Sequence, residues 1–415
     1  MAVILTGAQL VVVGGGGPVA ERAAIIGAAL AGAGLPVGAR IMVEDDEAAL
    51  ERALEVDGAL SVVLTGPGGS SGDIVRRALA RAGGTRLVLS ERMLGALEEW
   101  AQRQDRPLPR RAERLALLPQ GAAVWSAPGS EPAWAFETPR AAFAVLPRTA
   151  APEAVLEAHL VPFVQSRLGP RGGVAMRTLK TAGVGLIELE ERLADWLGPA
   201  VAAGGEVEVS TVPADAEVWV RLRARGATAL AAAEALAAAE EKIAALLGLD
   251  CYGRDEDALE GVVGRLLMAG GRSLSVAESC TGGLLGHRLT NVPGSSAYFE
   301  RGVLVYSNEA KETLLGVPDA LLRAHGAVSA ACAEAMAAGI CRVSGSPCGL
   351  AITGIAGPDG GTPTKPVGTV FIGVAVAGEV AAHRFRFPGD RAAVKWQSVQ
   401  TALDLLRRRL CAERG

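Results

Sequence analysis

A serine suited to nucleophilic catalysis stands in the string AESCTGG, residues 277–283, where an apolar strand is expected to turn into a helix. A hydroxyl at such a turn can project into a cleft. The backbone amides that follow lie at a helix N-terminus, where they can bind an anion or a developing oxyanion. Gly282 and Gly283 allow a ligand to approach the backbone closely. The string therefore predicts Ser279 as a nucleophile, with an ordinary helix cap as the alternative.

A serine nucleophile needs a base, and the sequence favours a lysine over a histidine. The chain has four histidines, and His287 would point along the helix that follows Ser279. The string YSNEAK places Tyr306 at a strand end, five residues before Lys311. A lysine desolvated in a cleft has a lowered pKa and can act as a base. The alternative is that Lys311 is a solvated helix charge. Cys280 is a rival nucleophile, but adjacent side chains diverge in such a turn.

Two further strings could complete a site for a phosphorylated ligand. AITGIAGPDGG, residues 351–361, is a strand followed by a glycine-rich loop, whose amides and Thr353 could line a phosphate or ring pocket. Its spacing matches neither a P-loop nor a dinucleotide-binding fingerprint. FPGDR, residues 387–391, opens the last helix with Asp390 as N-cap, and Arg391 could pair with a phosphate. The alternatives are a structural loop and a surface charge.

Alternating apolar runs and helical segments must position these residues. In the last third of the chain we expect strands at residues 273–279, 298–306, 349–354 and 367–378, a further strand ending near 390, and helices at 258–269, 281–290, 308–316, 329–343 and 391–410, with Ser329 as an N-cap.

The first two thirds of the chain predict two more α/β or α+β domains. Within residues 1–168, the buried strand Ala59–Thr65 leads into a Gly-Pro-Gly-Gly turn and a helix from Asp73, which is typical of a parallel sheet. Ligands of such sheets lie at the carboxyl ends of the strands. Residues 169–250 contain two alternating strands and an Ala-rich helix over 227–246. The boundary before the last domain is expected at about 247–255.

Composition excludes several classes of protein. The chain has 415 residues and a net charge of −4, without the strongly basic footprint of a nucleic-acid-binding protein. The cluster Arg407–Arg409 is expected to be the solvated end of the last helix. No basic leader and no apolar run of about 18–20 residues is present, so we expect a cytoplasmic protein outside the membrane. The six cysteines form no CxxC pair, which argues against disulfides and zinc.

Five strings of the chain together resemble the C-terminal domain of the CinA family (competence/damage-inducible protein A). They are AESCTGG, PGSSAYFERG, YSNEAK, AITGIAGPDGGTPTKPVGTV and FPGDR. The same domain occurs alone as a nicotinamide-nucleotide amidase. The resemblance implies hydrolysis of nicotinamide mononucleotide to nicotinate mononucleotide and ammonia, in pyridine-nucleotide recycling, without metal or cofactor. Ser279 would be the nucleophile, Lys311 its base and Tyr306 an orienting residue. The residues expected to contact substrate are Thr281, Gly282, Gly283, Thr353, Gly354, Gly357 and Arg391.

The resemblance extends more loosely over the rest of the chain. It implies a molybdopterin-binding-like α/β domain at 1–168, a KH-like α+β domain at 169–250 and an amidase domain at 256–415. Some relatives split ADP-ribose in the first domain with a divalent metal. Hard metals need clustered carboxylates, and the loop aspartates of the family are reduced here to Asp73. We therefore expect a degenerate pyrophosphatase site and a domain kept as scaffold or dimer interface.

Two alternatives to the amidase follow from the same resemblance. One is an interaction protein of competence and DNA repair that recruits the recombinase, with a homodimer expected in either case. The other is an ADP-ribose pyrophosphatase in the N-terminal domain. In the KH-like module we identify no GXXG clamp of the kind that nucleic-acid-binding KH domains use.

Overall fold

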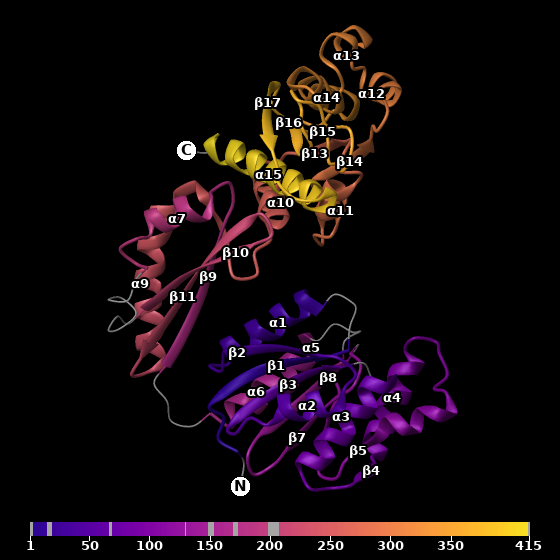
Figure 1. Cartoon of the computed structure of the whole chain (residues 1–415), viewed down its shortest axis with the longest axis vertical. Helices are drawn as coiled ribbons and strands as arrows, with labels where there is room; N and C mark the ends of the chain where they lie inside the picture. The colour runs from indigo at the N-terminus through magenta and orange to yellow at the C-terminus, as the bar shows by residue number, and fades with distance from the viewer. Residues whose placement is uncertain are drawn as a thin grey trace. The chain divides into compact units, whose positions relative to one another are not determined.

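The computed structural model describes residues 3–14, 19–65, 69–128, 130–147, 153–168, 173–197 and 207–413. The backbone divides into two compact units, one made of Met1–Met176 with Ala224–Ala235 and the other of Arg177–Arg223 with Leu236–Gly415. Both units combine helices with β-sheets (Figure 1), which confirms the predicted α/β class, and each of the three predicted domains has a main sheet of its own.

The N-terminal domain is built on a six-stranded sheet of order β2-β1-β3-β8-β7-β6. Strands β2, β1, β3 and β8 run parallel, and β7 and β6 complete the sheet antiparallel. The predicted strand Ala59–Thr65 is confirmed as β3 and is buried along its whole length. The strands are β1 (Gly7–Val13), β2 (Val37–Val43), β3, β6 (Ala123–Trp125), β7 (Ala133–Glu137) and β8 (Ala142–Pro147), with β4 (Leu87–Leu89) and β5 (Leu117–Pro119) forming a separate pair.

Helices cover both faces of this sheet, with one apolar cluster around α1 and α6 and another around α2, α3 and α4. Helix α3 begins at Gly69, four residues before the predicted start at Asp73. The first turn consists of glycine and serine, whose low helix propensity hides it from the sequence pattern. Residues 66–68 of the predicted Gly-Pro-Gly-Gly turn lie outside the described residues. The helical segments are α1 (Val19–Gly32), α2 (Glu47–Leu54), α3 (Gly69–Ala82), α4 (Glu91–Gln102), η1 (Arg110–Ala116), α5 (Glu153–Val155), η2 (Leu156–Leu160) and α6 (Val161–Gln165).

The KH-like domain is a four-stranded sheet of order β10-β11-β9-β12 with helices α7 and α9. Side chains along β11 alternate between buried and half-buried over most of its length, as the sequence pattern predicted. The elements are β9 (Gly173–Thr181), α7 (Leu186–Arg192), β10 (Val207–Ala214), β11 (Glu217–Gly226), α9 (Ala229–Leu247), η3 (Gly248–Asp250) and β12 (Cys251–Arg254).

The C-terminal domain is a three-layer α/β/α structure around a sheet of order β14-β13-β15-β16-β17. Strands β14, β13 and β15 are parallel, whereas β16 and β17 are antiparallel. Helices α10, α11 and α15 pack on one face, and α12, α13 and α14 on the other. The elements are α10 (Leu259–Ala269), β13 (Leu274–Glu278), α11 (Leu284–Thr290), η4 (Ser295–Ala297), β14 (Phe299–Leu304), α12 (Asn308–Leu315), α13 (Asp319–His325), α14 (Ala330–Ser344), β15 (Cys348–Gly354), β16 (Thr369–Val376), β17 (Glu379–Arg386) and α15 (Arg391–Ala412).

The predicted helix caps of this domain are confirmed, but one helix boundary is wrong. Ser329 accepts a hydrogen bond from Cys332 N, and Asp390 accepts one from Ala393 N. Helix α11 starts at Leu284 rather than at residue 281. The delay arises because Gly282 and Gly283 both adopt left-handed backbone conformations, with φ of 63° and 94°.

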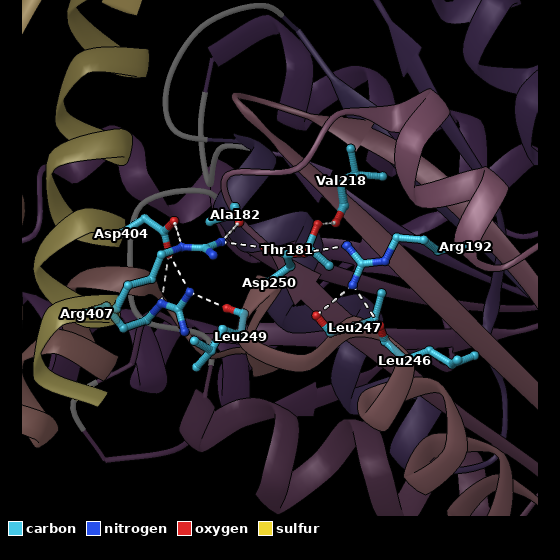
Figure 2. A network of polar contacts seen from close by, with 11 residues as sticks. Thr181, Ala182, Arg192, Val218, Leu246, Leu247, Leu249, Asp250, Asp404 and Arg407 are labelled. Carbon is cyan, nitrogen blue, oxygen red and sulfur yellow. Dashed lines mark hydrogen bonds and ion pairs between the residues drawn. The ribbon is translucent and has the colours of Figure 1, made fainter. Parts of the chain in front are cut away.

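A polar network joins α15 to the KH-like domain (Figure 2), and it overturns the expectation that Arg407 and Arg408 are solvated. Arg407 is 3% exposed, and its guanidinium binds Asp404 Oδ1 at 2.6 Å and Leu249 O at 2.5 Å. Arg408 binds the other carboxylate oxygen of Asp404, and also Asp250 Oδ1 at 2.6 Å. Asp250 in turn binds Arg192 of α7 at 2.5 Å. The sequence could not show that this helix end is covered by another domain.

The network should make the C-terminal unit sensitive to acid. Burial raises the pKa of Asp250, but hydrogen bonds from Arg192 and Arg408 outweigh it and hold the pKa below its ordinary 3.8. A carboxyl whose pKa is depressed by folding stabilises the fold fully above its unfolded pKa. That stabilisation is lost as pH falls through the folded value.

We therefore expect Asp250→Asn to lower the urea midpoint of the chain at pH 7 and to have a smaller effect at pH 3. Unfolding curves of the wild type and the variant at both pH values measure the difference. An effect of equal size at pH 3 and pH 7 would show that the charge of Asp250 is not what stabilises the junction.

Candidate active site

The loop between β13 and α11 holds Ser279 at the carboxyl end of β13, a strand that lies between β14 and β15. β13 is buried along its length and ends at Glu278. Ser279 N then donates to Ile352 O of β15 at 3.0 Å, which fixes the backbone at the strand end. The two left-handed glycines that follow turn the chain away from the sheet. Ser279 is 8% exposed, so its hydroxyl lies at the margin of the core.

Lys311 lies directly beside this serine, although 32 residues separate them in the chain. Its Nζ is 3.2 Å from Ser279 Oγ, 2.7 Å from Val305 O and 3.5 Å from Ser307 O. Ser307 caps α12 by accepting from Ala310 N, and this cap places Lys311 in the first turn of the helix. With 1% exposure, Lys311 is fully buried and is not the solvated helix charge that the sequence left open.

The partners of Lys311 determine what its amine can do. Two of the three are carbonyl oxygens, which only accept hydrogen bonds, whereas the serine hydroxyl can accept or donate. A neutral amine can therefore donate its two N–H bonds to Val305 O and Ser307 O and direct its lone pair at Ser279. Burial lowers the pKa of Lys311 below its ordinary 10.5, which favours this neutral form.

Cys280 is the neighbouring candidate nucleophile, and its surroundings disfavour that role. Its side chain is 6% exposed, and burial raises the pKa of its thiol to about 11. Because the thiolate is the reactive form of cysteine, a thiol with that pKa stays protonated near neutral pH. All six cysteines, Cys280 included, are free.

Glu278 is a functional residue that the sequence analysis missed. It is 2% exposed, and its carboxylate accepts from Gly283 N at 3.0 Å, Leu285 N at 3.1 Å and Gly286 N at 2.8 Å. These are the amides at the N-terminus of α11 that we expected to bind an anion. A side chain of the same loop occupies them instead, because a carboxylate satisfies unpaired helical N–H groups.

Other donors remain available next to Ser279. Among the described residues, the backbone amide of Thr281 donates to no acceptor, and that of Cys280 donates only to the thiol of the same residue. The Thr281 side chain is fully buried, and its Oγ1 likewise has no partner in the described part of the chain. Buried polar atoms are rarely left unpaired in native proteins. An unsatisfied hydroxyl and two amides beside a serine are suited to binding an oxyanion or a polar ligand.

Tyr306 and Arg391 contact each other rather than the serine–lysine pair. The Tyr306 side chain is 68% exposed, and its hydroxyl accepts from Arg391 Nη2 at 3.2 Å. Arg391 Nη1 also donates to Gly357 O at 2.8 Å. Within the described residues, no hydrogen bond joins the Tyr306 hydroxyl to Ser279 or Lys311. Arg391 thus ties the glycine-rich loop to the end of the β14 segment.

Thr353 and Gly354 end the strand β15 next to this loop. Thr353 is 1% exposed, and its hydroxyl donates to Ala327 O at 2.8 Å, so its oxygen can still accept. A Cβ at Gly354 would lie 2.7 Å from the Val370 side chain, so glycine is required there for close strand packing. The same Cβ would lie 2.8 Å from Thr369 O, so packing against β16 explains the glycine at position 354 without any ligand.

The first two turns of α15 also carry Lys395 and Trp396, two residues that the sequence analysis did not name as candidates. Lys395 lies one helical turn after Arg391, and its Nζ would be 3.5 Å from a Cβ placed on Gly282. The next residue, Trp396, donates from Nε1 to Asp215 O in the connection between β10 and β11, at 3.0 Å. The sequence signal that could have identified Lys395 is its spacing, since it lies four residues after Arg391 and therefore on the same face of the helix that Asp390 caps.

The N-terminal domain contains a separate hollow at the carboxyl ends of β3 and β8. Its lining includes Arg76 and Trp134. Asp73, which the sequence analysis took as the remaining aspartate of the family's loop, lies in α3, where it is ion-paired with Arg76 and lies 4.0 Å from Arg114. Within the described residues, no three His, Cys, Asp or Glu side chains gather as a metal ion would require. These residues do not fit the divalent metal of ADP-ribose-splitting relatives.

Comparison with known families divides the chain into three matches. Residues 2–159 match a probable molybdopterin-binding domain, 176–253 the KH domain of damage-inducible protein CinA, and 256–410 the CinA C-terminal domain. None of the helices in the described part of the chain has the length and apolar character that a bilayer crossing requires.

Relatives cover nearly the whole chain. A Moorella thermoacetica protein named as competence-damage inducible is 39% identical over 420 residues, covering 99% of this chain and 98% of the relative. A CinA-like protein of Geobacter sulfurreducens is 40% identical over 394 residues, covering 94% of each. A crystal structure of a CinA superfamily protein from Klebsiella pneumoniae is 40% identical, with a TM-score of 0.36, and covers 37% of this chain and 96% of that one.

Replacing Glu278 tests its part in forming the loop. Glu278→Ala leaves three backbone amides without an acceptor, so the free energy of unfolding should fall by about 1–3 kcal/mol. Denaturant unfolding of full-length protein measures the loss, with Glu334→Gln, an exposed carboxylate of α14, as the matched control. Equal stability of Glu278→Ala and the control would show that the cap is dispensable.

Proposed function

The chain belongs to the CinA family, and on that premise we propose that its C-terminal domain is an amidohydrolase converting nicotinamide mononucleotide to nicotinate mononucleotide and ammonia. One observation carries the proposal: a buried amine with no carboxylate partner among the described residues lies 3.2 Å from a serine hydroxyl at a strand–helix junction. Serine–lysine pairs are a recognised way of activating a serine for acyl transfer.

In the first half of the reaction, Ser279 Oγ attacks the amide carbon of the substrate while its proton passes to Lys311 Nζ. The carbonyl oxygen becomes an oxyanion, which the amides of Cys280 and Thr281 stabilise by hydrogen bonds. When the carbon–nitrogen bond breaks, Lys311 returns the proton to the leaving nitrogen, and ammonia departs. The product of this half is an ester between Ser279 and the nicotinoyl group.

In the second half, water attacks the ester carbon and gives a proton to Lys311. Collapse of this second intermediate releases Ser279 Oγ, which recovers the proton, and the nicotinate product leaves. Val305 O and Ser307 O hold two hydrogens of the amine throughout, so that its lone pair faces the serine in each half.

Removing either member of the pair should abolish turnover. We expect Ser279→Ala to lower the rate of ammonia release from nicotinamide mononucleotide by about 10³-fold or more. Lys311→Met should lower it by about 10²–10⁴-fold, the usual contribution of a general base. An ammonia assay on full-length protein measures both. Lys242→Met, an exposed lysine of α9, is the control for loss of one positive charge.

Full turnover in both Ser279→Ala and Lys311→Met would contradict the proposal. Turnover retained only in Lys311→Met would leave the serine as nucleophile and remove the lysine from the mechanism.

The pH dependence of the reaction should report the buried amine. Because burial lowers the pKa of Lys311, the neutral base forms at a lower pH than the ordinary 10.5. The kcat/KM of the free enzyme should therefore rise with pH along a limb whose midpoint lies below 10.5. Steady-state rates between pH 6 and pH 10 measure it. A kcat/KM that falls steadily across this range would contradict a neutral lysine base.

A further inference from the structure

The substrate of the proposed amidase carries a phosphate. The N-terminus of α11 would be the most obvious place to bind it, but Glu278 already occupies the amides there. Helix N-termini commonly bind phosphate through their free amides. In α11, however, Glu278 accepts hydrogen bonds from the amides of Gly283, Leu285 and Gly286. Its negative charge would also repel a second anion at that position. The phosphate must therefore be bound by other groups.

Lys395 is the cation that faces the catalytic loop without a partner. Its side chain is half-buried in the second turn of α15, and its Nζ would lie 3.5 Å from a Cβ on Gly282, two residues after Cys280. No hydrogen bond or ion pair of Lys395 Nζ occurs within the described part of the chain. Arg391, by contrast, already donates to Gly357 O and to the Tyr306 hydroxyl.

A second, independent feature of the same loop points to a ligand. Thr281, the residue before Gly282, is fully buried, and its hydroxyl has no partner among the described residues. An unpaired buried hydroxyl costs about 1–3 kcal/mol, which a bound polar group would relieve. A phosphate oxygen is a strong acceptor for a hydroxyl and for an ammonium group alike.

We propose that Lys395 binds the 5′-phosphate of the substrate, with Thr281 as a neighbouring donor, and that it makes the site selective for a mononucleotide over its nucleoside. This inference rests on the proposed amidase function. In this proposal, residues of different helices activate the serine and bind the phosphate. Lys311 in α12 acts on the hydroxyl, and Lys395 in α15 acts on the far end of the substrate.

The test compares nicotinamide mononucleotide with nicotinamide riboside, which lacks the phosphate. In Lys395→Met we expect the KM for the mononucleotide to rise about 10–100-fold, the usual effect of losing one charged hydrogen bond, with kcat nearly unchanged. Turnover of the riboside should not change. Lys395→Arg, which keeps the charge, should restore most of the affinity, and Lys242→Met is the matched control. An unchanged preference for the mononucleotide in Lys395→Met would overturn the proposal.

A binding experiment separates this inference from the amidase itself. Calorimetry with nicotinate mononucleotide needs no turnover, and the wild type should bind it about 10–100-fold more tightly than Lys395→Met does. If the wild type releases no ammonia but shows this difference, the amidase proposal fails and the phosphate site stands. If ammonia is released and the two affinities are equal, the reverse holds.

Discussion

The C-terminal domain depends on one arrangement, an amine buried against a serine hydroxyl with no counterion in the described part of the chain. Lys311 contacts two carbonyl oxygens and Ser279 Oγ, and it is 1% exposed. Desolvation penalises the ammonium form, so this position favours a neutral amine with its lone pair near the hydroxyl. The arrangement requires the ends of β13 and β14 and the start of α12 to meet at one edge of the sheet. The parallel pairing of these strands places them there.

The charged side chains around Ser279 and Lys311 lie at the starts of α11 and α15, two helices that pack on the same face of the sheet. Glu278 neutralises the N-terminus of α11, and Arg391 and Lys395 give the start of α15 a positive charge. A carboxylate held by three backbone amides also fixes the turn that carries the serine, since any shift of the loop would break those bonds. One buried side chain therefore both shapes the loop and excludes a ligand from the helix end next to it.

In the other domains, ion pairs hold the charged side chains next to the sheets and helices. In the N-terminal domain, Asp73 of α3 forms an ion pair with Arg76. In the KH-like domain, Asp250 binds Arg192 of α7 in the same domain and Arg408 of α15. Ion pairs that are partly buried and joined in a network are worth more than isolated surface pairs. The long last helix thus lies beside the loop of Ser279 at its start and takes part in the junction with the KH-like domain near its end.

The sequence by itself determined the α/β class, most elements of the last domain and the chemical character of Ser279 and Lys311. These depend on local patterns: apolar periodicity, glycine-bearing turns and helix caps such as Ser329. Only the tertiary structure decided that these two side chains meet, that Glu278 fills the end of α11 and that Arg407 is buried. Each of these facts joins residues from different elements. Burial and hydrogen-bond partners at such distances follow from how the sheet and helices pack, which no local pattern encodes.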